Sequence, residues 1–89
     1  MNAAASPVVR VWVPEVWDVI EVAVTPEQTV AQVKGEALRR AVGEQADPDQ
    51  FVVKYRGGLV ADEALTLATL KVPDHAPMIV LPARRRPVR

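Results

Sequence analysis

Few side chains in this 89-residue sequence could carry chemistry, and their spacing argues against an enzyme. His75 is the only histidine and there is no cysteine, so the chain lacks a thiol nucleophile and the converging ligands of a typical metal site. Nearby acids occur as Asp47 with Asp49 and as Asp62 with Glu63. Acids at such positions are typical of turns and helix caps. With no glycine-rich phosphate loop or nucleophile elbow, we expect no catalytic residue, no metal and no cofactor.

Arginines are concentrated at the end of the sequence, in Arg84, Arg85, Arg86 and Arg89. They are four of the 11 basic side chains, so residues 1–81 hold 7 basic against 11 acidic side chains and a net charge of −4. This asymmetry favours a solvated basic tail or a tail that docks in an acidic protein groove. The acidic body has no basic stripe interleaved with aromatic residues, which argues against nucleic acid as a partner.

One amphipathic helix is predicted over residues 29–43, and other elements must pack against it. Thr29 and Gln32 have the spacing of a capping box, and Gly43 suits the C-terminal end. Gly35 lies inside the helix, at a cost of about 1 kcal/mol relative to alanine. The helix therefore depends on packing along its apolar stripe, which consists of Val30, Val33, Ala37, Leu38, Ala41 and Val42.

Short β-branched and apolar runs on both sides of the helix predict the sheet that covers it. We expect strands over residues 8–13, 19–24, 51–56 and 78–81, with a very short strand at 59–60 after a turn at Gly57-Gly58. A helical turn is expected within residues 64–70 and a loop over residues 73–77. Alternation assigns these side chains to the core: Val9, Val11, Val13, Ile20, Val22, Val24, Val53, Tyr55, Met78 and Val80. The result is an α+β domain over residues 8–82, between a flexible N-terminus (1–7) and a flexible tail (83–89).

The order and spacing of several short motifs resemble ubiquitin and its β-grasp relatives over residues 8–81. The helix opens with Thr29-Val30 and Val33-Lys34, and Pro48-Asp49-Gln50 leads into the third strand. Gly57, Leu59-Val60, Asp62, Thr66-Leu67, Leu70 and Val72 follow at near-constant spacing. The resemblance implies a β-grasp fold, with a mixed four- to five-stranded sheet packed on one α-helix.

Two departures from ubiquitin bear on function. Conjugated members of the family and the related sulfur carriers end in Gly-Gly, whereas this sequence ends with arginines and its Gly57-Gly58 pair is internal. Lys54 stands where the family has a central isoleucine, and Ile79 and Leu81 take the flanking positions. Trp12 occupies a position that is aromatic in ubiquitin.

The parity of the strands predicts a contact surface on the side of the sheet away from the helix. In the β-grasp order the first, last and third strands are neighbours, which would join Trp12, Val52, Lys54, Ile79 and Leu81 into one patch. Val16 and Trp17 would extend it at the tip of the first hairpin. An apolar cluster of this kind usually marks a contact with a protein partner or a second copy. The alternative is that the tail or the N-terminus covers it.

We therefore interpret the chain as a non-catalytic ubiquitin-like protein-interaction module that binds through this patch and its basic tail. One alternative is a protein modifier of a bacterial ubiquitination-like pathway, conjugated through a processed or non-glycine C-terminus, with an activating enzyme or peptidase as partner. Another is an accessory protein of a type VII-like secretion system. The composition hints at a bacterial source. The absence of a signal peptide and of a long apolar run predicts a cytoplasmic protein without a membrane span.

Overall fold

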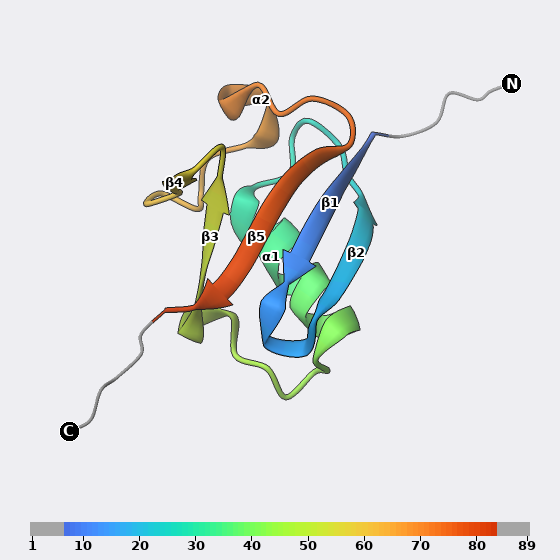
Figure 1. Ribbon diagram of the computed structural model, residues 1–89. Helices are drawn as coiled ribbons and strands as arrows, with labels where there is room; N and C mark the ends of the chain where they lie inside the picture. Colours follow the sequence, from blue (N-terminus) through green and yellow to red (C-terminus); the bar gives the residue numbers. More distant parts are fainter. Residues whose placement is uncertain (1–6, 84–89) are drawn as a thin grey trace, which may run out of the picture.

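A five-stranded sheet curves over one long helix in the part of the chain that the computed structural model describes, residues 7–83 (Figure 1). The strands are β1 (Val8–Val13), β2 (Asp18–Ala23), β3 (Phe51–Tyr55), β4 (Gly58–Leu59) and β5 (Ala76–Pro82). The α-helices are α1 (Val30–Ala41) and α2 (Leu67–Leu70), and the 3₁₀ helices are η1 (Pro14–Val16) and η2 (Pro48–Gln50). This is the predicted order of strands and helices.

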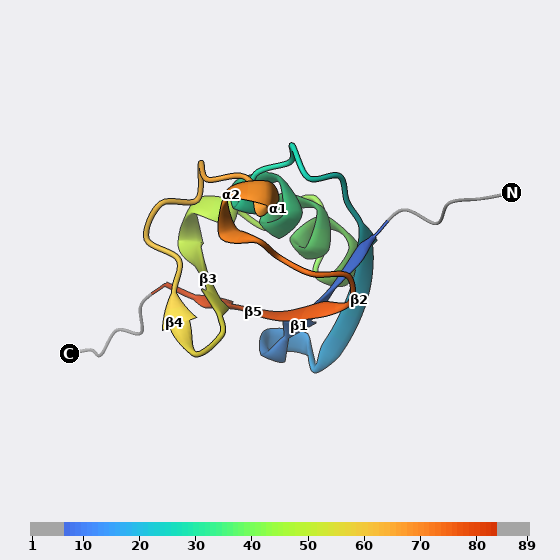
Figure 2. The same cartoon turned by 90° about the horizontal axis from the view of Figure 1, so that it is seen from above.

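The sheet is mixed, with the strand order β2-β1-β5-β3-β4. The two strands that are farthest apart in the sequence, β1 and β5, lie parallel at its centre, with Val11 opposite Met78. All other neighbouring strands are antiparallel. Both α-helices lie on the same side of the sheet, and the opposite side carries no α-helix of the described residues (Figure 2). The strand order confirms the prediction that the last strand, β5, lies between the first strand, β1, and the third, β3.

The core forms between α1 and the inward side chains of the strands. Every second residue of β1 is fully buried, and the same alternation continues in β5, as the strand period requires. The predicted assignment holds for most positions, while Ile20 and Tyr55 are only half-buried at the edge of the core. The buried side chains of the sheet and α1 are Val9, Val11, Val13, Val22, Val53, Met78, Val80, Val30, Val33, Ala37 and Leu38.

Both predicted ends of α1 are confirmed. The Gln32 N–H donates to Thr29 Oγ1 at 3.2 Å, and the Thr29 N–H donates to Gln32 Oε1 at 2.9 Å, which completes a capping box. At the other end, the Gly43 N–H donates to the Leu38 carbonyl oxygen at 3.0 Å. Gly43 has φ 129°, a conformation that favours glycine because it has no Cβ.

Two local predictions were wrong. The tight turn before β4 consists of Arg56 and Gly57, both with positive φ, and Gly58 already belongs to β4. Positive φ at both positions is typical of the type I′ hairpin turn, whose backbone follows the strand twist, so the turn takes Arg56 as well as one glycine. The last strand begins at Ala76, inside the predicted loop, because Ala76 is buried and pairs with Val9 of β1.

The exposed side of α1 carries ion pairs that reach the edge of the sheet. Glu36 is paired with both Arg39 and Arg40. Arg40 also donates through Nη1 to the carbonyl oxygen of Glu21 at 3.0 Å. Since β2 is the outermost strand on that side, this contact ties the helix to the sheet edge.

The one buried charged side chain among residues 7–83 is Lys34, which faces inward from α1. Its ammonium group pairs with the Glu63 carboxylate and donates to the Phe51 carbonyl oxygen at 2.9 Å. One side chain thus joins α1 to the start of β3 and to the loop before α2. A buried ammonium group requires such partners, because an unpaired charge in the interior is very costly.

Replacing Gly35 with alanine is expected to stabilise the protein by about 0.5–1 kcal/mol, because alanine favours the helix and a Cβ at this position meets no atom within 4 Å. Urea unfolding measures the change. Gly43→Ala is the matched control and should destabilise, since φ is positive there and a Cβ would collide with the Gln45 side chain. Equal effects of the two substitutions would contradict this account.

Replacing Glu63 with alanine is expected to lower the free energy of unfolding by about 2–3 kcal/mol, because it leaves the buried Lys34 ammonium with a single carbonyl partner. Glu27→Ala removes an exposed carboxylate and serves as the control, with an expected change below about 0.5 kcal/mol. Comparable urea midpoints for the two variants would show that the ion pair contributes little.

Candidate protein-interaction surface

The side of the sheet opposite α1, here called the outer face, brings together the five residues predicted from strand parity. Trp12 of β1 lies opposite Ile79 of β5, and Ile79 lies opposite Lys54 of β3. Farther along β5, Leu81 lies opposite Val52. The register therefore makes one continuous surface across β1, β5 and β3.

The outer face presents apolar surface interrupted by one charge. Trp12 is 40% exposed, while Val52, Ile79 and Leu81 are half-buried among their neighbours on the sheet. Lys54 is exposed and is paired on its other side with Leu59, which is 58% exposed. Lys54 thus divides the apolar surface and gives it a positive charge, so a purely apolar partner would have to desolvate an ammonium group.

The tip of the β1–β2 hairpin carries the other two predicted residues. Val16 is 40% exposed and Trp17 is 83% exposed. The Trp17 N–H donates to the Pro14 carbonyl oxygen at 3.1 Å, which holds Trp17 at φ 56°. The tip curls to the side of the sheet away from α1 (Figure 2), so it is an extension of the outer face.

Next to Trp12 the outer face contains a shallow hollow that the sequence analysis did not predict. Its volume is about 340 Å³, and its lining residues are Arg10, Trp12, Val19, His75, Pro77, Met78 and Ile79. Val19 is 49% exposed and lies opposite Trp12. The parity rule would have found Val19, since Ile20 and Val22 were assigned to the core and their neighbour must point outward.

Charged and titratable groups border this hollow. Arg10 lies 3.7 Å from Glu21 across the β1–β2 pair, and both side chains are more than half exposed, so the pair is weak. At the other end, His75 Nδ1 lies 3.1 Å from Asp74 Oδ2. The hollow therefore combines apolar walls with a guanidinium group and an imidazole at its rim.

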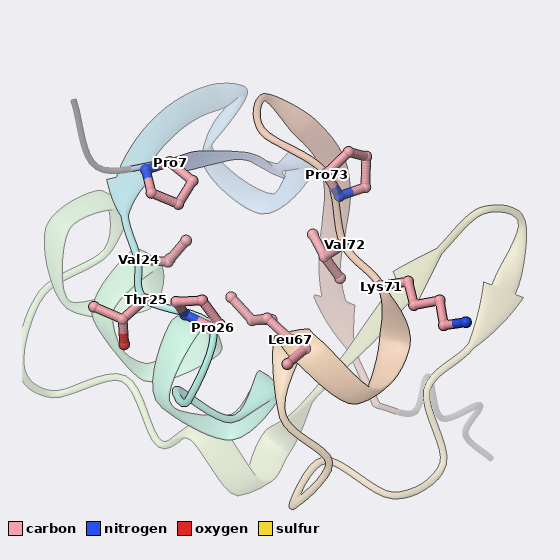
Figure 3. A pocket seen from close by; sticks show the side chains of 9 residues that line it. Pro7, Val24, Thr25, Pro26, Leu67, Lys71, Val72 and Pro73 are labelled. Carbon is pink, nitrogen blue, oxygen red and sulfur yellow. The ribbon is translucent and has the colours of Figure 1, made fainter. Parts of the chain in front are cut away.

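A second, smaller pocket lies on the helix side of the molecule and holds none of the predicted residues (Figure 3). It has a volume of about 80 Å³ and lies between α2, the loop before α1 and the segment before β5. Lys71 directs its ammonium group away from the centre, so the walls are mostly apolar. Pockets that bind small molecules are several times larger, which argues against a cofactor here.

Three of the four acids considered for catalysis, Asp47, Asp62 and Glu63, are engaged with the backbone or with Lys34. Asp47 accepts the Asp49 N–H at 3.0 Å and Asp62 accepts the Ala64 N–H at 3.1 Å, as turns and caps require. Within residues 7–83, no three acidic or histidine side chains are grouped to hold a metal ion. No helix in this part of the chain is long and apolar enough to cross a membrane. The predicted tail residues Arg84, Arg85, Arg86 and Arg89 lie outside the described residues.

Asp74 should make stability depend on pH in the acid range. The Val8 N–H donates to Asp74 Oδ1 at 2.8 Å, and this hydrogen bond lowers the pKa of the carboxyl below its ordinary value of 3.8. A carboxyl group whose pKa is lower in the folded than in the unfolded state stabilises the fold at pH values above its unfolded-state pKa. This stabilisation is lost as pH falls through the folded-state pKa. Wild type should therefore exceed Asp74→Asn in unfolding free energy at neutral pH, and the difference should shrink as pH falls below the ordinary value of 3.8 and through the lower folded-state pKa. A pH-independent difference in urea unfolding would contradict this.

Comparison with known proteins identifies the fold. No protein-family model and no curated protein sequence matches the chain. Among solved structures, a ubiquitin of Caldiarchaeum subterraneum superposes with a TM-score of 0.74 at 18% identity, covering 91% of this chain and 98% of that one. A protein designed on the template of human erythrocytic ubiquitin gives a TM-score of 0.73 at 20% identity, covering 93% and 99%. The chain thus has the ubiquitin-like β-grasp fold, as its sequence motifs predicted.

Proposed function

We propose that this chain is a non-catalytic protein-interaction module that binds partner proteins through its outer face. The observation that supports this most directly is the run of apolar side chains across three neighbouring strands, from Trp12 of β1 across Ile79 and Leu81 of β5 to Val52 of β3. An extended apolar surface bordered by polar groups is typical of contact sites, and tryptophan is frequent among the residues that dominate binding energy.

The charges on the outer face define the partner further. Arg10 and Lys54 project from this side, and Glu21 is the only acid among the outward residues of β1, β2 and β3. Residues 1–81 carry a net negative charge, so the part of this face formed by the strands, away from Glu15 and Asp18 at the hairpin tip, is locally more positive than its surroundings. A partner that combines apolar side chains with carboxylates would match it, and the arginines that follow β5 in the sequence would add attraction.

Substitution on the outer face tests the proposal. Trp12→Ala and Leu81→Glu should each weaken capture of partner proteins from native cells by at least about 10-fold, because each removes apolar contact near the centre of the surface. Ala31→Glu, on the exposed side of α1, is the control and should leave capture unchanged. Thermal unfolding confirms that each variant is folded. Partners that bind all three variants alike would refute a role for this face.

A second candidate function is that of a protein modifier, favoured by the structural likeness to the archaeal ubiquitin. A modifier must be processed or activated at its C-terminus. A protein-interaction module needs neither processing nor activation. The two functions therefore predict different covalent forms of the protein in the cell.

Intact-mass spectrometry of the untagged protein from native cells separates the two functions. A single full-length mass, allowing for loss of Met1, is expected for the interaction module. A mass shortened within the arginine-rich tail, or a ladder of higher masses, would favour the modifier instead.

A further inference from the structure

Trp17 occupies a position that local folding preferences would give to another residue. Its φ of 56° lies in the left-handed region, which costs free energy for any side chain with a Cβ and favours glycine or asparagine. The bulky indole gains nothing in return within the chain, since the residue is 83% exposed. A large apolar side chain that is costly to hold and unburied is best explained by a contact outside its own chain.

The residues around Trp17 fix its position and define what it can contact. Pro14 begins η1, where its ring limits the backbone, and its carbonyl oxygen accepts the Trp17 N–H at 3.1 Å. Val16 adds a second exposed apolar side chain. Glu15 and Asp18 flank the pair and are exposed. The hairpin tip is therefore an apolar wedge between two carboxylates, and it fits an apolar recess with positive charge at its rim.

The hollow on the outer face has these complementary properties. Trp12, Val19 and Ile79 supply apolar walls, and Arg10 places a guanidinium group at the border. Glu21 lies 3.7 Å from this group, but both side chains are more than half exposed, so the pair is weak and Arg10 can still attract a carboxylate from outside the chain. Trp17 cannot enter the hollow of its own chain, because it lies just beyond the last pair of the same hairpin, Val13 with Asp18. A second copy can offer the hollow to this tip.

We propose that two copies of this chain associate, with Trp17 of each copy inserted in the outer-face hollow of the other. Glu15 and Asp18 of one tip then lie near Arg10 of the other copy, where opposite charges attract. The tip lies on the side of the sheet away from α1 (Figure 2), and the hollow is lined by outward residues of the same side, so a two-fold axis can satisfy both contacts at once and close the assembly at two copies.

Self-association of this kind goes beyond the proposed function and does not depend on it, since it needs no partner protein. It does share Trp12 and Ile79 with the partner-binding surface. Pairing of two copies would therefore cover the outer face, and partner proteins would compete with it.

Sedimentation of the purified 89-residue protein from about 5 μM to 1 mM tests the proposal. The mean mass should rise from one copy to two over this range, as expected for a small interface. Trp17→Ala should weaken association at least 10-fold, and Leu59→Ala, which truncates another exposed apolar side chain, should not. Arg10→Glu should also weaken it, and adding Glu15→Arg and Asp18→Arg to that variant should restore it.

Three results would overturn the proposal: a single-copy mass up to 1 mM, association that survives Trp17→Ala, or assemblies that keep growing beyond two copies. Thermal unfolding of each variant shows whether it is folded. If the triple variant associates again, the loss of association in Arg10→Glu is due to charge and not to misfolding. Sedimentation uses only the purified protein, so its result does not depend on a partner. If the protein stays monomeric there but still captures partners through Trp12, the pairing is refuted and the proposed function stands.

Discussion

The position of α1 relative to the sheet depends on the contacts of the buried Lys34 ammonium group. This group holds α1 to the start of β3 through the Phe51 carbonyl and to the loop before α2 through Glu63. The same loop completes the N-terminus of the helix, because the Ala31 N–H donates to the Glu63 carbonyl oxygen at 2.9 Å. Backbone donors that a helix cannot satisfy by itself are thereby occupied. Since β3 is also one of the three strands of the outer face, the contact that fixes the helix also positions the candidate binding surface.

Strand alternation explains why so much of the fold could be predicted from the sequence. Once Val9 and Val11 are assigned to the core, Trp12 must point to the other side, and the β-grasp strand order then makes Ile79 its neighbour. The burial of Lys34 could not be predicted in this way, since a charged residue on an amphipathic helix is normally solvated. Its partner Glu63 lies far along the sequence, and no local pattern connects the two.

Turn conformation was the other feature that sequence patterns predicted poorly. Within residues 7–83, four residues other than glycine adopt positive φ, namely Trp17, Arg56, Lys71 and His75. Arg56 and Lys71 complete tight turns next to strands or helices, and the backbone N–H of His75 donates to the Val8 carbonyl oxygen at 2.7 Å. At these three residues the conformation is imposed by the pairing of the elements on either side, which overrides the preference of the individual residue. The hollow beside Trp12 escaped prediction for a related reason: it depends on residues from three segments that only the folded sheet brings together.

The contact between Arg40 and the Glu21 carbonyl oxygen also bears on how this valine-rich chain avoids aggregation. β2 is an edge strand, and unpaired carbonyl and amide groups at an edge can template the addition of another strand. The guanidinium group occupies one acceptor and places a hydrated positive charge where an incoming backbone would have to lie. At the opposite edge, β4 spans only two residues, too few to template an extended ladder. Both margins of the sheet therefore carry a feature that disfavours the addition of another strand.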